Sequence, residues 1–364
     1  MGLLLQNTFG LIRNLSFLYS LIVFLYGCGS SDGDKVNFAV TEAEIYLNSG
    51  DCTSALNVLN EIGNQKTSTR YLMTLASAYG CKAGYSSTGI YSTFTSFSSG
   101  LDATNPFGQL TKAPTATSMT TGDDVDFLNL QSAINTLLYA GGLSTANNPS
   151  TSSRATIFSN DDAFDMNVLI FYMLFDQLGR YAYYYGCYDG DPSGTPTKGT
   201  QRNSPLPLCT NGTNECFASY SDSTLDLDGS SETNISTLLN ANPSSMFGSC
   251  NARTLGHTDL DATNGAYNSS QVSSLCQGVV LMNNLREVLK GISAGFADVP
   301  DLKNAFDNIN TQFGVIEGYG NNSGISDVMS TLSQTKCEAD FGADSTGKGK
   351  LSIYFVLFFE TMFR

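Results

Sequence analysis

The most regular pattern of apolar positions in the chain lies between residues 161 and 185. Apolar side chains recur there at alternating steps of four and three positions, which is the spacing of one helix face. This stripe consists of Phe164, Val168, Phe171, Phe175, Leu178, Ala182 and Tyr185. Positions 170, 173 and 174 are apolar as well, so we expect a helix that is buried on most sides at the centre of a domain.

Helical periodicity is weaker in the rest of the chain, and irregular polar segments such as 143–160 separate the periodic ones. The weaker helical stretches span residues 123–140, 231–240, 271–296, 298–313 and 325–332. The final apolar stretch, 351–363, has helical spacing, but its aromatic and β-branched residues fit a strand equally well. Taken together, these patterns predict an all-α fold.

Residues 36–65 have the pattern of two helices joined by a turn at Gly50 and Asp51. Their small and apolar positions, Ala43, Tyr46, Gly50, Ala55 and Leu59, resemble a tetratricopeptide repeat. A second, incomplete copy begins at Arg70, with Tyr79 placed 33 residues after Tyr46. The resemblance is partial, because Ala39 and Glu42 replace the early Trp and Leu of the repeat, and Ile62 and Thr67 replace its later Ala and Pro. It implies a scaffold of helical hairpins, and a plain helical hairpin is the alternative.

The first apolar run of the chain, Leu15–Tyr26, is too short to span a bilayer and is typical of a secretory signal. It ends in Leu25-Tyr26-Gly27-Cys28, which resembles the lipobox of bacterial lipoproteins. An ordinary cleaved signal peptide and an uncleaved anchor are the alternatives, because Tyr26 is bulky for the motif and Arg13 is the only charge before Cys28.

The lipobox resemblance implies that residues 1–27 are a lipoprotein signal peptide and that Cys28 carries the lipid, including palmitate. Residues 28–35 would then form a polar, lipidated tether. Gly29, in place of Asp, resembles lipoproteins that are sorted to the outer membrane. We therefore expect a lipid-anchored protein of the cell envelope, on either the periplasmic or the surface side of the outer membrane.

The chain has nine cysteines, and the use of Cys28 for lipid leaves an even number. The eight candidates for disulfides are Cys52, Cys81, Cys187, Cys209, Cys216, Cys250, Cys276 and Cys337. They allow up to four bonds in 105 connectivities, of which we predict only Cys52–Cys81, at facing ends of neighbouring helices. A metal site is not expected, because there is no C-x-x-C motif and His257 is the single histidine.

The remaining organisation follows from these patterns. We expect tetratricopeptide-like hairpins over 36–100, a linker rich in Ser, Thr, Gly and Pro over 101–122, and a helical domain over 123–364. This domain contains a long irregular insertion, 187–268, in which four of the cysteines lie.

Charge narrows the possible partners. The chain has 18 Lys and Arg against 33 Asp and Glu, a formal net charge of −15, and it has no cluster of basic residues. Such a balance argues against nucleic-acid partners and against electrostatic binding to anionic lipid. The low content of charged residues, 14%, suits an exported protein with neutral loops.

Two short motifs have a catalytic counterpart, and neither is complete. The segment from Gly342 to Lys348 fits the start of a P-loop but has Gly349 where the magnesium-binding hydroxyl belongs. Ser333-Gln334-Thr335-Lys336 fits the S-x-x-K pattern of penicillin-binding enzymes without its Lys-Thr-Gly companion. We therefore expect no catalytic residues, no cofactor and no enzymatic activity.

The hypothesis that fits best is a non-enzymatic scaffold or protein-binding module at the outer membrane, with a protein of the envelope as its partner. The alternative is a lipoprotein that binds solutes or glycans for an uptake system. Its ligand would stack on the tyrosines at the end of the central helix, Tyr181, Tyr184 and Tyr185, although such residues are more often part of a core and its rim.

Overall fold

The computed structural model describes residues 32–85, 119, 121–185, 267–292, 295, scattered positions between 303 and 318, and 324–359. Throughout these ranges the regular structure is helical and no strand is found, which confirms the all-α prediction. The helices are α2 (Asp32–Asn48), α3 (Cys52–Glu61), α4 (Thr69–Lys82), α7 (Val125–Leu138), η1 (Ala140–Gly142), α8 (Thr151–Ala155), α9 (Asn160–Tyr185), α11 (Ser269–Ile292), α13 (Ser326–Met329), α14 (Gln334–Phe341) and α15 (Ser345–Phe358).

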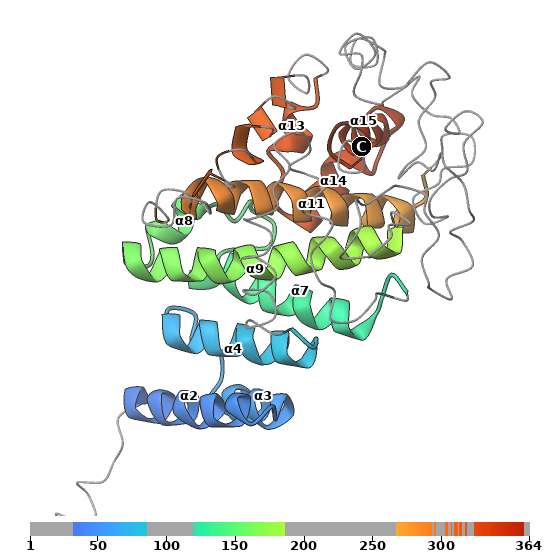
Figure 1. The fold of residues 1–364 in the computed structure, drawn as a ribbon. Helices are drawn as coiled ribbons and strands as arrows, with labels where there is room; N and C mark the ends of the chain where they lie inside the picture. Colours follow the sequence, from blue (N-terminus) through green and yellow to red (C-terminus); the bar gives the residue numbers. More distant parts are fainter. Residues whose placement is uncertain are drawn as a thin grey trace, which may run out of the picture.

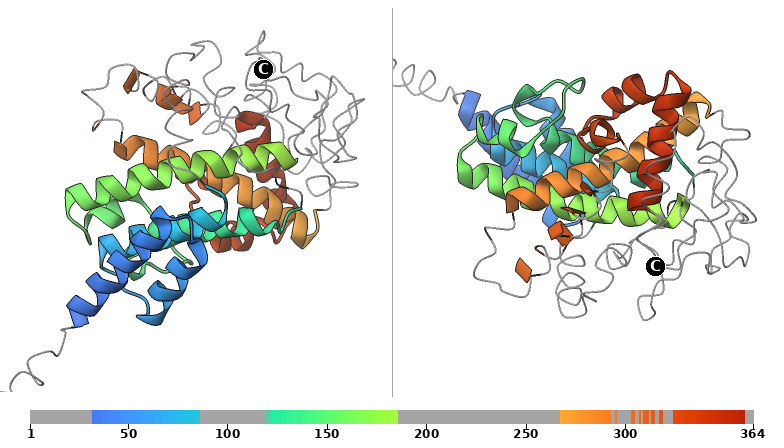
Figure 2. Two further views of the ribbon diagram at one scale, coloured as in Figure 1. Left: turned by 60° about the horizontal axis from the view of Figure 1, so that its bottom comes forward. Right: turned by 90° about the horizontal axis from the view of Figure 1, so that it is seen from above.

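The helices are stacked in nearly the order of the chain (Figure 1). The hairpin of α2 and α3 forms one end of the stack, and α4, α7, α9 and α11 follow as successive layers. The C-terminal helices α13, α14 and α15 cover the other end, and α9 runs beside α11 in all views (Figure 2). One cluster of buried apolar residues extends through the stack from Val40 to Phe359.

Helix α9 is the central layer, as its apolar pattern predicts. It packs against α7 on one side and against α11 on the other. Phe171, Phe175 and Leu178 are each at most 1% exposed. A helix enclosed by two others buries more than one stripe, and this explains why the apolar positions of its sequence extend beyond a single face.

The predicted N-terminal hairpin is present, with its turn at the expected residues. Gly50 has a φ of +79°, a left-handed conformation that glycine adopts without strain. Asp51 caps α3, since its carboxylate accepts a hydrogen bond of 3.0 Å from the Ser54 amide. The predicted Cys52–Cys81 disulfide is also present and joins the start of α3 to the end of α4, with 5.5 Å between the Cα atoms. The hairpin alone does not establish a tetratricopeptide repeat, and that resemblance stays a prediction.

Three local predictions differ from the structure. The C-terminal stretch is helical from Ser345 to Phe358, so the strand alternative is wrong for these residues. The segment 143–160 was expected to be a loop, yet it contains the short helix α8, which the Ser150 side chain caps. Helix α14 was not predicted, because its eight residues are mostly polar and too few to display a period.

A second disulfide, Cys276–Cys337, joins α11 to α14, with a Cα–Cα distance of 5.7 Å. The other five cysteines lie outside the described residues, as do the signal peptide, residues 28–31 of the expected tether, most of the expected linker and nearly all of the insertion. Predictions for those segments, including the domain boundaries, stay predictions. Residues 32–35, expected to belong to the tether, are instead the first turn of α2.

Candidate functional site

The three tyrosines at the end of α9 are packed inside the protein. Tyr181 and Tyr185 are 0% and 1% exposed, and Tyr184 is 8% exposed. The Tyr181 hydroxyl donates to the Ser274 carbonyl over 2.9 Å, and burial raises the pKa of this phenol well above its usual value. With their rings covered, the three residues do not offer an exposed stacking platform, and Tyr181 and Tyr185 join α9 to α11 through Ser274.

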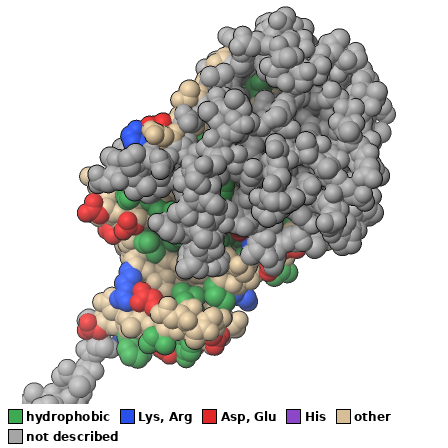
Figure 3. All heavy atoms as spheres, in the orientation of Figure 1, with side chains coloured by type: hydrophobic (Ala, Val, Ile, Leu, Met, Phe, Trp, Pro, Cys, Tyr) green, Lys and Arg blue, Asp and Glu red, His purple; other side chains and the backbone are tan. Residues whose placement is uncertain are grey.

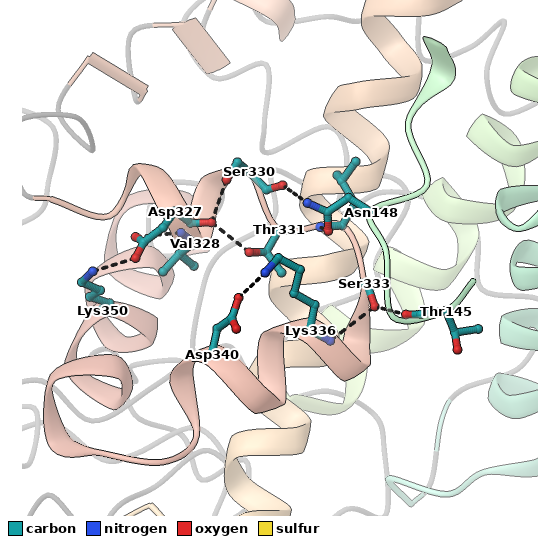
Figure 4. Close-up of polar contacts among 11 residues, drawn as sticks. Thr145, Asn148, Asp327, Val328, Ser330, Thr331, Ser333, Lys336, Asp340 and Lys350 are labelled. Atoms are coloured by element: carbon teal, nitrogen blue, oxygen red, sulfur yellow. Dashed lines mark hydrogen bonds and ion pairs between the residues drawn. The ribbon is translucent and has the colours of Figure 1, made fainter. Parts of the chain in front are cut away.

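The Ser333-x-x-Lys336 motif is the start of a helix. The Ser333 hydroxyl donates to the Thr145 carbonyl and accepts the Lys336 backbone amide, which is the arrangement of an N-cap (Figure 4). The Lys336 ammonium group turns away and bonds to the Asp340 carboxylate at 2.6 Å. No proton acceptor among the described side chains therefore activates this serine for nucleophilic attack.

The glycine-rich segment that begins at Gly342 also has a structural role. Asp344 caps α15 by accepting the Gly347 amide at 2.7 Å. The Lys348 ammonium group donates to the Tyr267 carbonyl over 2.8 Å. A β-carbon at position 347 would lie 2.7 Å from the Phe341 backbone, so glycine is required for close packing of α15 on the end of α14. The amide and the cation that a phosphate would need are occupied.

The described residues contain neither a metal-binding cluster nor a membrane-spanning helix. Their His, Cys, Asp and Glu side chains form no group of three or more with the proximity that metal binding requires. None of their helices combines the length and apolar character of a membrane crossing.

The end of the helix stack formed by α2 and α3 carries a broad groove. This terminal groove, with a volume of about 650 Å³, runs between α2 and α3. It is lined by Asp34, Lys35, Phe38, Ala39, Glu42, Val58, Glu61 and Ile62. Helix α2 buries Ala39, Val40 and Ala43 against its neighbours, and this orientation directs Phe38 away from the core with 73% of its surface exposed. Ile45, two helical turns further along, is 63% exposed.

Polar contacts join α2 to α4 at this end of the stack. Arg70 of α4 forms a bidentate ion pair with Glu44, at 2.6 and 3.0 Å, and a hydrogen bond of 3.1 Å to the Thr41 hydroxyl. These contacts and the Cys52–Cys81 disulfide hold the hairpin against α4. Figure 3 shows apolar side chains interspersed with acidic ones on this end of the molecule.

A second feature at the other end of the stack is a turn, residues 330–333, that asparagine side chains hold. Asn148 donates to the Ser330 carbonyl at 2.9 Å (Figure 4). Its side-chain oxygen accepts from the Leu332 amide, also at 2.9 Å. From α11, the buried Asn283 side chain donates to the Val328 carbonyl just before the turn and to the Thr331 carbonyl within it, and Asn284 donates to the Leu332 carbonyl, each at 2.8 Å. The turn is therefore fixed between α7–α8 and α11, and it forms one wall of a small cleft.

This cleft, which we call the amide cleft, lies where α7, α11 and α14 meet and has a volume of about 240 Å³. Eight of its side chains are polar and uncharged: Gln131, Asn135, Tyr139, Thr145, Ser273, Gln277, Gln334 and Thr335. The aliphatic part consists of Leu138, Val280, Leu281 and Leu332. No sequence motif indicates this cleft, because its residues come from three distant segments. The only signal was the pair of asparagines within the apolar helix α11.

Buried charge was also overlooked. Arg154 is fully buried, and its guanidinium group donates twice to the Asn167 side chain, at 2.8 and 3.0 Å, and to two backbone carbonyls. Burial lowers the pKa of Arg154 to about 10, although Glu287 opposes the shift. The four hydrogen bonds that Arg154 donates connect α7, α8 and α9, so this arginine is a structural cross-link between helices.

Comparison of the chain with known protein families, with curated proteins and with solved structures found no match, so the terminal groove and the amide cleft are the basis for functional inference.

Proposed function

We propose that the protein is a lipid-anchored, non-enzymatic binding module of the cell envelope. Its terminal groove would receive an amphipathic helix of a partner protein that carries basic residues beside its apolar stripe. The observation that supports this proposal most is the exposure of Phe38 at the mouth of a groove between two fixed helices.

The shape and composition of the groove fit a helix. Phe38, Glu42 and Ile45 follow one another along the same side of α2. Val58 of α3 and Ile62, its C-cap residue, line the opposite wall. Grooves of this kind accept the apolar face of a helix at positions i, i+3, i+4 and i+7. An exposed aromatic ring beside a pocket is the usual energetic centre of a protein interface.

The charges around the groove favour a basic partner. Asp34, Glu42 and Glu61 line it together with one cation, Lys35. A second copy of this chain, with a net charge of −15, would bring further negative charge to the same surface. The same charges disfavour contact with anionic lipid headgroups. The groove is therefore better suited to a basic helix than to self-association or to a membrane surface.

The proposed lipid anchor would keep the groove close to the membrane. Helix α2 begins at Asp32, four residues after Cys28. Because an extended residue spans at most ~3.6 Å, α2 would begin within ~15 Å of the lipidated cysteine. A membrane-associated partner would then meet the groove at a high effective concentration.

The experiment measures binding of the full chain to two synthetic helical peptides with the same leucine stripe. One peptide carries lysines on its polar face and the other carries glutamates. We expect the basic peptide to bind, and the acidic peptide to bind at least ~10-fold more weakly. The Phe38→Asp substitution should reduce the affinity for the basic peptide by a similar factor. Val125→Asp is the matched control, since Val125 is 70% exposed on α7, away from the groove.

Unfolding midpoints should be alike for both variants, because both side chains are already exposed. Equal binding of the two peptides, or equal binding by the wild type and Phe38→Asp, would contradict the proposal. Self-association that Phe38→Asp abolishes would identify a second copy as the occupant and would contradict it as well.

A further inference from the structure

The amide cleft has an unusual lining, because none of the twelve side chains around it is charged. A ligand with a phosphate, carboxylate or ammonium group would lose its hydration there without gaining a partner of opposite charge. The lining therefore selects against ionised ligands and favours a neutral ligand with many hydrogen-bonding groups.

Several of these groups are unoccupied. Within the described part of the chain, the Gln277 side chain and the Thr335 hydroxyl have no hydrogen-bond partner. Asn135 accepts one bond from Gln131, at 3.1 Å, and its amino group has none to another described residue. A carboxamide both donates and accepts, so Gln277 and Asn135 together offer two donor–acceptor pairs across the cleft.

The walls of the cleft are fixed before any ligand enters. Gln334 on α14 donates to the Ser273 carbonyl of α11 at 3.0 Å and to the Glu338 carboxylate at 2.7 Å. The Cys276–Cys337 disulfide joins the same two helices within one turn of these contacts. Rigid walls reduce the entropy cost of binding.

We propose that the amide cleft binds a single neutral sugar ring. Adjacent hydroxyl groups of a sugar present alternating donors and acceptors, which match carboxamides, while the C–H faces of the ring suit Val280 and Leu332, the more exposed of the aliphatic side chains. The volume of about 240 Å³ is below the ~300–1,000 Å³ of sites for drug-sized ligands, so one ring is the size that fits. The inference uses no residue of the terminal groove and is independent of the function proposed above.

The test is ligand-observed saturation-transfer NMR on the full chain with five probes. Glucose, galactose and N-acetylglucosamine are the neutral sugars, and glucuronate and glucosamine are the charged controls. We expect saturation transfer to at least one neutral sugar, with a dissociation constant in the millimolar range or below, and none to the charged controls. Gln277→Ala and Asn135→Ala should each raise the dissociation constant of that sugar by up to ~10-fold.

Asn129→Ala is the matched control, because Asn129 lies on α7, forms no part of the cleft and should leave binding unchanged. Asn135 is exposed, so its variant stays informative even if Gln277→Ala unfolds. Absence of transfer to all three neutral sugars would overturn the proposal. Equal transfer to glucuronate, or unchanged binding by Asn135→Ala, would overturn it too.

Discussion

Separating the buried ion pair of α9 should have consequences that depend on which partner is removed. Asp176 and Arg180 lie one turn apart with side chains 2% and 1% exposed, and the Arg180 Nε bonds to the Asp176 carboxylate at 3.0 Å. Arg180 also donates to the Ala83 carbonyl at the end of α4, at 2.8 Å. Burial raises the pKa of Asp176 to about 6, with Arg180 opposing this shift.

The two single variants differ because only one of the remaining charges can be neutralised. Asp176→Leu leaves a buried guanidinium group without its counter-charge, and we expect a cost of ~3–5 kcal/mol in the free energy of unfolding. Arg180→Met leaves a carboxyl group that can take up a proton, so its cost should be smaller. The double variant Asp176→Leu/Arg180→Met should recover most of the lost unfolding free energy. We expect it to stay ~1–3 kcal/mol below the wild type, because the Ala83 carbonyl loses its donor.

The pH dependence of Arg180→Met follows from the same contacts. Arg180 lowers the pKa of Asp176, so its removal raises this pKa further above the ~3.9 of an unfolded chain. Above about pH 6 the native variant then binds a proton that neither its unfolded state nor the wild type binds. The unfolding free energy of the variant should therefore increase, relative to the wild type, as the pH falls through neutrality to about 6. Asp176→Leu should show no such recovery.

The assay is urea denaturation of the wild type and the three variants at several pH values, with the midpoint and the slope of each transition fitted separately. The reasoning is refuted if, at about pH 6, Asp176→Leu is no more destabilised than Arg180→Met. The reasoning is also refuted if the difference in unfolding free energy between Arg180→Met and the wild type does not change with pH.

Three further outcomes are expected. Cys28→Ser should abolish metabolic labelling with a fatty acid, and a label that survives would contradict lipidation at this residue. Loss of the Cys52–Cys81 bond through Cys81→Ser should cost ~3.5 kcal/mol by loop entropy, measured as a lower urea midpoint against the oxidised wild type, and an unchanged midpoint would contradict this. Phe171→Ala should cost ~3–5 kcal/mol by opening a cavity in the core, while Val125→Ala, at an exposed position, should stay within ~0.5, as thermal unfolding of both would show.

Local pattern was sufficient to predict much of the helical framework. The stripe from Phe164 to Tyr185 specifies α9, because the side chains that must share one face are only three or four residues apart. The hairpin turn at Gly50 and the Cys52–Cys81 bond were predictable for a related reason, since both depend on helices that follow one another directly in the chain. Short segments such as α14 were missed, because they contain too few residues for a period.

Tertiary structure alone decided the sites. Phe38 and Ala39 are neighbours on one apolar stretch, and only the packing of α2 on α3 and α4 determines that Phe38 is the exposed one. The amide cleft combines side chains more than a hundred residues apart, so no local spacing could predict it. Which helices meet also decides the surroundings of the buried Asp176–Arg180 pair. It likewise decides that Cys276 bonds to Cys337. Periodicity is fixed within each helix, whereas contacts between helices depend on how the whole set of apolar faces is buried together.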